Sequence, residues 1–132
     1  MRVRRAAYVL LPVLLVAAGI WWIARGGGPG PQQLTGRGAH YTVRVDLEPV
    51  TGPLEARIGV DPEPDEVSAF AVMPHMGHTT PELPAGRDAT GGYVVRGELF
   101  TMAGAWEISV RVRGGPGTEV ITVNTLVGEG DR

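Results

Sequence analysis

The chain has 132 residues, a net charge of −2 at neutral pH, no Cys and 43% hydrophobic residues. The lack of Cys excludes disulfides, zinc fingers, iron–sulfur clusters, thiol catalysis and a lipoprotein anchor, and the lack of Lys excludes Schiff-base chemistry. Residues 1–25 carry four Arg and no acid, whereas residues 26–132 carry eight Arg against fourteen acids, a net charge of −6. Such an acidic region repels phosphate backbones, so nucleic-acid binding is not expected.

An uncharged hydrophobic segment covers residues 6–24, and 17 of these 19 residues are apolar. As a helix it nearly matches the roughly 30 Å core of a bilayer. Three Arg precede it, so the positive-inside rule predicts a cytoplasmic tail at residues 1–5, a transmembrane signal anchor at 6–24 and an extracytoplasmic remainder in the cell membrane. The alternative is a signal peptide cleaved after the small residues at 16–18. Cleavage there would leave the Ile-Trp-Trp-Ile run at residues 20–23 exposed, which favours the retained anchor.

Beyond the anchor, the pattern changes to that of a β-protein. Residues 25–38 are rich in Gly and Pro and predict a flexible linker, unable to form a helix or a central strand. From residue 39, short apolar or alternating runs predict strands at residues 41–47, 54–60, 67–73, 93–100, 105–113 and 119–127. Together these features predict an all-β, immunoglobulin-like Greek-key sandwich of six or seven strands over residues 39–128, with a tail at 129–132. We expect the fourth and fifth of these strands to form a hairpin and Trp106 to fill the core.

Residues 74–92 have no clear pattern and predict a long loop, holding at most one short edge strand. At its start, residues 73–78 read Met-Pro-His-Met-Gly-His, which places two thioethers and two imidazoles within six residues. These are ligand types for copper, and the thioether favours Cu(I). Methionine also persists outside the cytoplasm, where a free thiol is oxidised.

The spacing favours a common site for these side chains. Pro74 biases Met73 towards an extended backbone, which projects Met73 and His75 to one side. Gly77 permits a tight reversal that returns His78 towards them. In a Greek key whose long loop adds an edge strand, the strand at 93–100 becomes the fifth. We expect it to run the same way as the third, at 67–73, so that Met73 and Met102 share one end of the sandwich.

We therefore predict a copper site in which three or four ligands come from a Met-His cluster, namely Met73, His75, Met76, His78 and Met102. Each residue alone has an ordinary explanation, as core filler for methionine or as a loop histidine, and the prediction depends on their combination. The ring of Trp106, if it lies near the cluster, can also cover a Cu(I) ion by cation–π contact. No nucleophile–base pair and no small-molecule substrate site are evident, so we do not expect an enzyme.

Three segments resemble the YtkA-like and FixH-like family: residues 71–78 (AVMPHMGH), 92–93 (GY) and 97–108 (GELFTMAGAWEI). The resemblance covers roughly residues 40–127, and its most specific elements are Met-Pro-x-Met-x-His and Met-x-Gly-x-Trp. It implies a small protein with one N-terminal membrane helix, an immunoglobulin-like outer domain and a role in copper handling or cbb3-type cytochrome oxidase assembly. The resemblance also implies that Met73, Met76, His78 and Met102 are copper ligands, with His75 as an addition. The chain is short for a FixH-like protein, and the YtkA-like pattern fits better.

These observations predict a membrane-anchored, extracytoplasmic protein that holds Cu(I) for copper delivery or homeostasis. The expected partner is a copper transporter or an oxidase assembly protein, and the acidic surface either docks a basic partner or keeps the domain soluble. Two alternatives remain open. One is an interaction module whose Met-His loop packs on another membrane protein without metal, and the other is a sensor or accessory domain beside a metal transporter.

Overall fold

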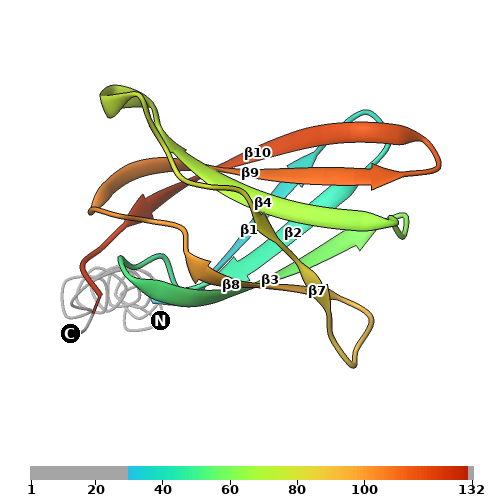
Figure 1. The fold of residues 1–132 in the computed structure, drawn as a ribbon, viewed down its shortest axis with the longest axis horizontal. Helices are drawn as coiled ribbons and strands as arrows, with labels where there is room; N and C mark the ends of the chain where they lie inside the picture. The colour runs from blue at the N-terminus through green and yellow to red at the C-terminus, as the bar shows by residue number, and fades with distance from the viewer. Residues whose placement is uncertain (1–29, 131–132) are drawn as a thin grey trace, which may run out of the picture.

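The computed structural model of the protein describes residues 30–130, and the predicted membrane anchor at residues 6–24 lies outside them. The described part is built from ten β-strands in two antiparallel sheets and one 3₁₀ turn (Figure 1). No helix among these residues is long and apolar enough to cross a membrane. The predicted all-β class is confirmed.

The first sheet has the strand order β1-β2-β3-β8-β7. Its strands are β1 (Gln32–Arg37), β2 (Thr42–Leu47), β3 (Pro53–Asp61), β8 (Tyr93–Glu98) and β7 (Gly86–Arg87). The second sheet has the order β10-β9-β4-β5, and β6 also pairs with β4. Its strands are β10 (Gly117–Val127), β9 (Gly104–Gly114), β4 (Glu66–Met73), β5 (His78–Thr79) and β6 (Leu83–Pro84), with the 3₁₀ turn η1 (Pro74–Met76) between β4 and β5.

One hydrophobic core lies between the sheets, and the alternation in the sequence predicts which residues fill it. From β9 the inward residues are Trp106, Ile108, Val110 and Val112, all fully buried. β2 and the residue before it contribute Tyr41, Val43, Val45 and Leu47 in the same way. Trp106 is the largest fully buried side chain, which confirms its predicted place in the core.

The predicted hairpin between the fourth and fifth strands is wrong. These strands are β8 and β9, and they lie in different sheets: β8 pairs with β3, whereas β9 pairs with β4 and β10. Residues 99–103 therefore cross from one sheet to the other. The buried side chains of Leu99 and Phe100 explain the crossing, because they fill the core between the two sheets.

The strands that lead to Met73 and to Met102 run in the same direction, as the Greek-key expectation requires. β4 and β9 pair antiparallel, with Val72 opposite Glu107. The end of β4 therefore lies beside the start of β9. The strand that runs with β4 is β8 (Figure 1), so both Met73 and Met102 lie at the end of the domain that carries η1. We call this the η1 end.

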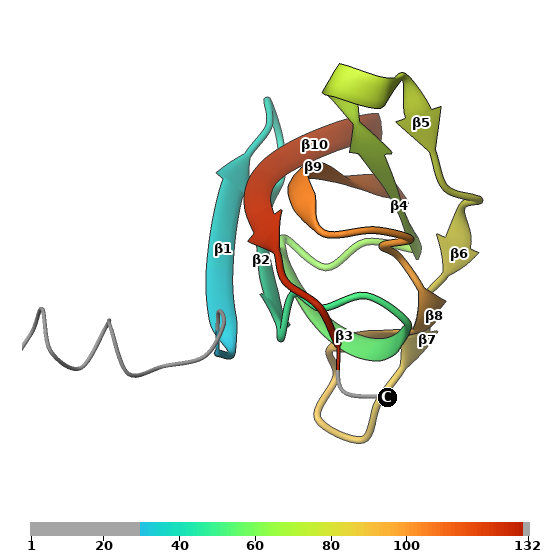
Figure 2. The ribbon, with the colours of Figure 1, turned by 90° about the vertical axis from the view of Figure 1, so that its left-hand side faces the viewer.

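The long loop at residues 74–92 is more ordered than predicted. It contains η1 and three two-residue strands, of which β5 and β6 pair with β4 while β7 pairs with β8. The loop thus leaves the edge of one sheet and joins the edge of the other (Figure 2). Such short pairings follow from the hydrogen-bonding needs of the strand edges rather than from apolar periodicity, which is why the pattern does not reveal them.

The predicted linker at residues 25–38 is wrong for residues 32–37, which form β1 at the edge of the first sheet. β1 pairs with β2 along its whole length, from Gln32 opposite Leu47 to Arg37 opposite Thr42. Gly36 lets β1 lie close to β10 of the other sheet, because a Cβ there would lie 2.8 Å from the Ile121 methyl. The β-domain therefore begins before residue 39.

Candidate metal site

Two of the predicted ligands face each other across the turn that joins β4 to β5. Met73 ends β4, His78 begins β5, and the two are register partners. Opposite residues of an antiparallel pair project to the same face, so His78 points to the side on which Met73 is buried. The reversal depends on Gly77, which has a left-handed backbone (φ 58°) and donates its N–H to the Pro74 carbonyl at 3.3 Å.

Thr80 holds this turn in place. Its backbone N–H donates to the Ala71 carbonyl at 2.9 Å, and its buried hydroxyl accepts the Ala71 N–H at 3.0 Å. Ala71 lies two residues before Met73, and Thr80 lies two residues after His78. The two bonds fix the backbone positions of Met73 and His78 relative to each other.

Trp106 lies on the other side of Met73. Because Val72 pairs with Glu107, the next residue of β4, Met73, stands opposite Trp106. The indole ring meets the imidazole of His78 edge-on, with ring centroids 6.1 Å apart and planes at 78°. It packs in a similar way on Phe100, with centroids 5.6 Å apart. His78, Met73 and Trp106 thus form a row across three neighbouring strands.

The loop that carries Met102 joins this row at Trp106. The indole Nε1–H donates to the backbone carbonyl of Met102 at 2.9 Å. The Met73 methyl reaches the same loop, since a Cβ at Gly104 would lie 2.8 Å from it. Met73 is 5% exposed and Met102 is 40% exposed, so one thioether comes from the core and the other from the surface.

The remaining two predicted ligands, His75 and Met76, lie on the exposed turn η1. η1 has no buried residue, and Met76 at its end is 65% exposed. His75 lines a groove whose wall also includes Trp106. We therefore distinguish an inner set (Met73, His78 and Met102), whose segments meet at Trp106, from an outer pair (His75 and Met76) on the turn. Within the inner set only Met73 is buried, whereas His78 and Met102 are exposed.

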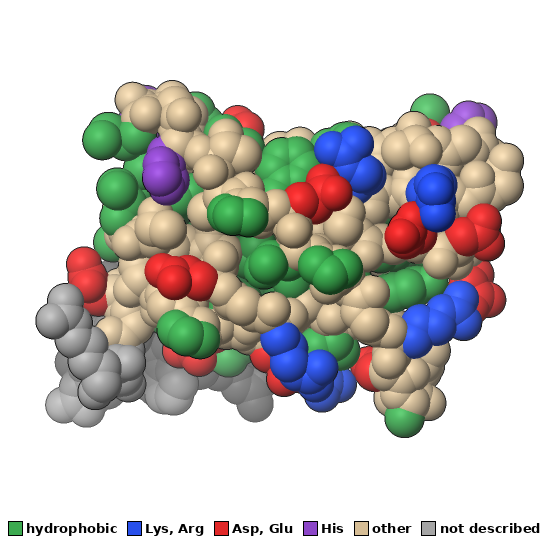
Figure 3. All heavy atoms as spheres, viewed as in Figure 1, with side chains coloured by type: hydrophobic (Ala, Val, Ile, Leu, Met, Phe, Trp, Pro, Cys, Tyr) green, Lys and Arg blue, Asp and Glu red, His purple; other side chains and the backbone are tan. Residues whose placement is uncertain are grey.

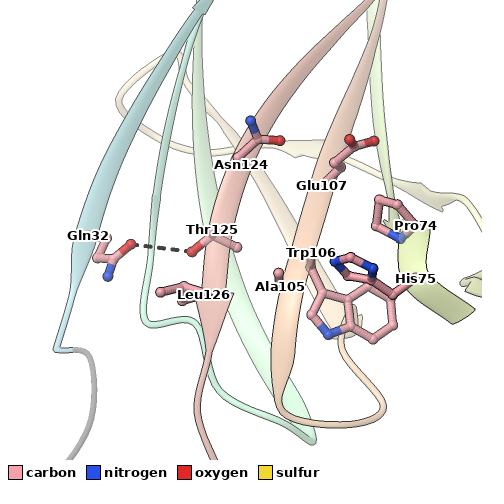
Figure 4. A pocket seen from close by; sticks show the side chains of 9 residues that line it. All are labelled: Gln32, Pro74, His75, Ala105, Trp106, Glu107, Asn124, Thr125 and Leu126. Carbon is pink, nitrogen blue, oxygen red and sulfur yellow. Dashed lines mark hydrogen bonds between the residues drawn. The ribbon is translucent and has the colours of Figure 1, made fainter.

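The groove beside His75 has a volume of about 410 Å³ and runs from β1 to η1 across β10 and β9 (Figure 4). On the β1 side of the groove, the Thr125 hydroxyl donates to the Gln32 side-chain oxygen at 3.3 Å. Its walls are formed by Gln32, Pro74, His75, Ala105, Trp106, Glu107, Asn124, Thr125 and Leu126. The sequence pattern does not reveal this groove, because residues 32–37, which form one of its walls, resemble a linker. The outward position of Leu126 in the alternating strand 119–127 was a signal for it.

The η1 end is acidic. Its loops and strand ends, at residues 48–52, 74–79, 98–107 and 124–130, carry four carboxylates and no Arg: Glu48, Glu98, Glu107 and Glu129. In Figure 3 a histidine and several hydrophobic side chains gather at this end. The arginines visible in the same view lie towards the middle and the other end of the domain. The six ion pairs formed among residues 30–130 use none of these four carboxylates. The η1 end therefore has a negative potential favourable to cations.

Within residues 30–130 no three His, Asp or Glu side chains are placed to hold one metal ion. Comparison of the chain with protein-family models, with curated proteins and with solved structures gives no match. What can be inferred about its function rests on its own residues and their arrangement.

Proposed function

We propose that the protein binds Cu(I) through the inner set Met73, His78 and Met102. The observation that carries the proposal is the convergence on Trp106 of two methionine-bearing segments, distant in sequence, and one imidazole-bearing strand. Two thioethers and one imidazole make a soft, neutral ligand set suited to Cu(I), which harder oxygen-binding cations do not favour. The carboxylates of the η1 end raise the local concentration of the cation.

Trp106 has a second role in this proposal. Its ring already contacts His78 edge-on and is anchored through Nε1 to the Met102 loop. An indole face beside a bound cation stabilises it by cation–π attraction and keeps water away from it. Water exclusion matters because it protects Cu(I) from oxidation and from competing ligands.

The outer pair completes the predicted ligand set. His75 and Met76 lie on an exposed turn, where they are free to contact an ion before it reaches the inner set or after it leaves. A ligand that touches the metal only in passing changes the rate of exchange without changing the affinity.

We further propose that residues 6–24 anchor the protein in the cell membrane and that the β-domain is immunoglobulin-like and extracytoplasmic. In support, β2-β3-β8-β7 and β4-β9-β10 reproduce the strand connections of the two sheets in an immunoglobulin constant domain, with β1 as an addition. The resemblance to YtkA-like and FixH-like proteins supports copper delivery or homeostasis, including respiratory oxidase assembly. In this role the protein is a carrier and not an enzyme.

A competition titration tests the copper proposal. The full chain in detergent micelles is titrated anaerobically with Cu(I) against a chromophoric Cu(I) chelator, beside the variants Met73→Leu, His78→Gln and Met102→Leu. We expect one Cu(I) per chain and a loss of affinity for each variant larger than the roughly 10- to 100-fold caused by disturbing an outer-shell partner. Ile58→Leu is the matched control, because it changes a buried side chain in the other sheet and leaves the cluster intact.

One other function has a specific observation in its favour. Three of the four exposed large hydrophobic side chains of residues 30–130 lie at the η1 end, namely Met76, Met102 and Leu126. An exposed apolar patch of this kind is typical of a protein interaction surface. If no variant alters Cu(I) binding, or if no Cu(I) binds, this metal-free interaction module replaces the copper proposal.

A further inference from the structure

The direction of β1 shows at which end of the domain the N-terminal segment arrives. Gln32 begins β1 and pairs with Leu47, the last residue of β2. Its side chain accepts a hydrogen bond from Thr125 and lines the groove that also contains His75 and Trp106. The chain therefore enters the β-domain at the η1 end, beside the candidate copper ligands.

Few residues separate this entry point from the proposed membrane anchor. Residues 25–31 lie between the anchor at 6–24 and the start of β1. Even when fully extended, seven residues span at most about 25 Å. The opposite end, at the turn between β9 and β10, lies farther away by the length of β9, whose 11 residues extend about 35 Å.

We propose that the domain presents its η1 end to the membrane, so that the Met-His cluster faces a partner embedded in the same bilayer. This inference rests on the proposed membrane anchor but not on copper binding. A partner that exchanges metal with the cluster has to hold its own site within about 25 Å of the bilayer surface, the reach of the tether. An integral membrane protein meets this condition.

The charge of the η1 end specifies the partner further. Four carboxylates and no Arg lie on its loops and strand ends. A bare anionic lipid surface repels such an end, whereas a membrane protein with Arg or Lys around its outer opening attracts it. The apolar side chains of Met76 and Leu126 then provide the contact area inside the charged rim.

Energy transfer to the membrane tests the orientation. The chain has no Cys, so one introduced Cys is a unique attachment point for a fluorophore. Thr79→Cys places it at the η1 end on exposed β5, and Gly115→Cys places it at the far end, where a side chain meets nothing within 4 Å. The full-length variants are reconstituted in phosphatidylcholine vesicles whose surface carries an acceptor-labelled lipid.

We expect the transfer efficiency from position 79 to exceed that from position 115 at least about twofold, because the two positions differ by roughly 35 Å along the strands. Insertion of twenty Gly and Ser residues after Gly30 should reduce the difference, because the longer tether lets the domain turn over. Equal efficiencies, or the reverse order, overturn the proposal. The measurement contains no metal, so its failure is distinct from a failure to bind Cu(I).

Discussion

Gly104 is the position at which the contact between Met73 and the Met102 loop can be broken most directly. It has a φ of 140°, which side-chain-bearing residues rarely adopt, and a Cβ there would lie 2.8 Å from the Met73 methyl. Gly104→Ala therefore has two costs: backbone strain of about 1–3 kcal/mol and displacement of the Met73 side chain. Gly117 has a similar φ of 127° with nothing within 4 Å, so Gly117→Ala carries the strain alone.

Urea unfolding followed by circular dichroism separates the two costs. We expect Gly117→Ala to lower the free energy of unfolding by about 1–3 kcal/mol, and Gly104→Ala to lower it by more. Met73→Ala alone should cost about 2–5 kcal/mol, because it leaves a cavity in the core. Combined with Gly104→Ala it should cost less than the sum of the two single changes, since the alanine methyl no longer meets Met73.

Two results refute this reasoning. One is an equal loss of stability in Gly104→Ala and Gly117→Ala. The other is additivity of Gly104→Ala and Met73→Ala within about 0.5 kcal/mol, the usual limit for independent sites. Either result means that the Met73 side chain does not lie over Gly104, and the inner set then loses one of its members.

Three further predictions concern other parts of the domain. Met76→Leu should slow both uptake and release of Cu(I) in stopped-flow exchange with a chelator while the Kd stays the same; a changed Kd would place Met76 in the inner set. Tyr41→Phe should unfold at an equal or higher temperature, because the Tyr41 hydroxyl is buried and has no hydrogen-bond partner among the described residues. Tyr93→Phe removes a hydroxyl that donates to the Pro64 carbonyl at 3.0 Å and should unfold at a lower temperature, so similar losses in the two variants would contradict this. The pKa of Asp88 is lowered from its ordinary 3.8 chiefly by the side-chain hydrogen bond from Thr90, with backbone bonds from Thr90 and Gly92 adding to it. Asp88 thus stabilises the fold above pH 3.8 and loses this effect as the pH falls through its lowered pKa. Asp88→Asn should therefore be less stable than the wild type at pH 7, and the difference should shrink as the pH falls through that pKa; a difference independent of pH would refute this.

The strands that the sequence predicts correctly are those with a strong alternation or a continuous apolar run. β9 is the clearest case, because every second residue from Trp106 to Val112 is apolar and buried. β1 was missed because its sequence, QQLTGR, places only Leu34 against the core, and Gly and Pro precede it. The assignment of β8 and β9 to different sheets also has no local signal, since it follows from how Leu99 and Phe100 pack in three dimensions.

In the candidate site, too, the contacts within one short segment were predictable from the sequence, and the contacts between distant segments were harder to predict. The pairing of Met73 with His78 depends on the local segment 71–80, and Pro74 and Gly77 within it predict the reversal of the chain. The approach of the Met102 loop depends on the antiparallel pairing of β4 with β9, which joins segments far apart in sequence and follows only from the Greek-key topology. The separation of His75 and Met76 from the other three ligands arises from the 3₁₀ turn, which periodicity does not reveal.

The short strands of the long loop also affect how the domain behaves beside other copies of itself. Strand edges with free N–H and C=O groups pair readily with other chains and so promote aggregation. Here β5 and β6 occupy the free edge of β4, and β7 occupies that of β8, while β1 lies against β10 on the opposite side (Figure 2). The edges of β4 and β8 are thereby covered by segments of two residues each, too short to recruit a neighbouring strand, whereas on the other side the sheets end in β10 and β1. The same loop that carries the Met-His turn thus protects one side of the domain against edge-to-edge association.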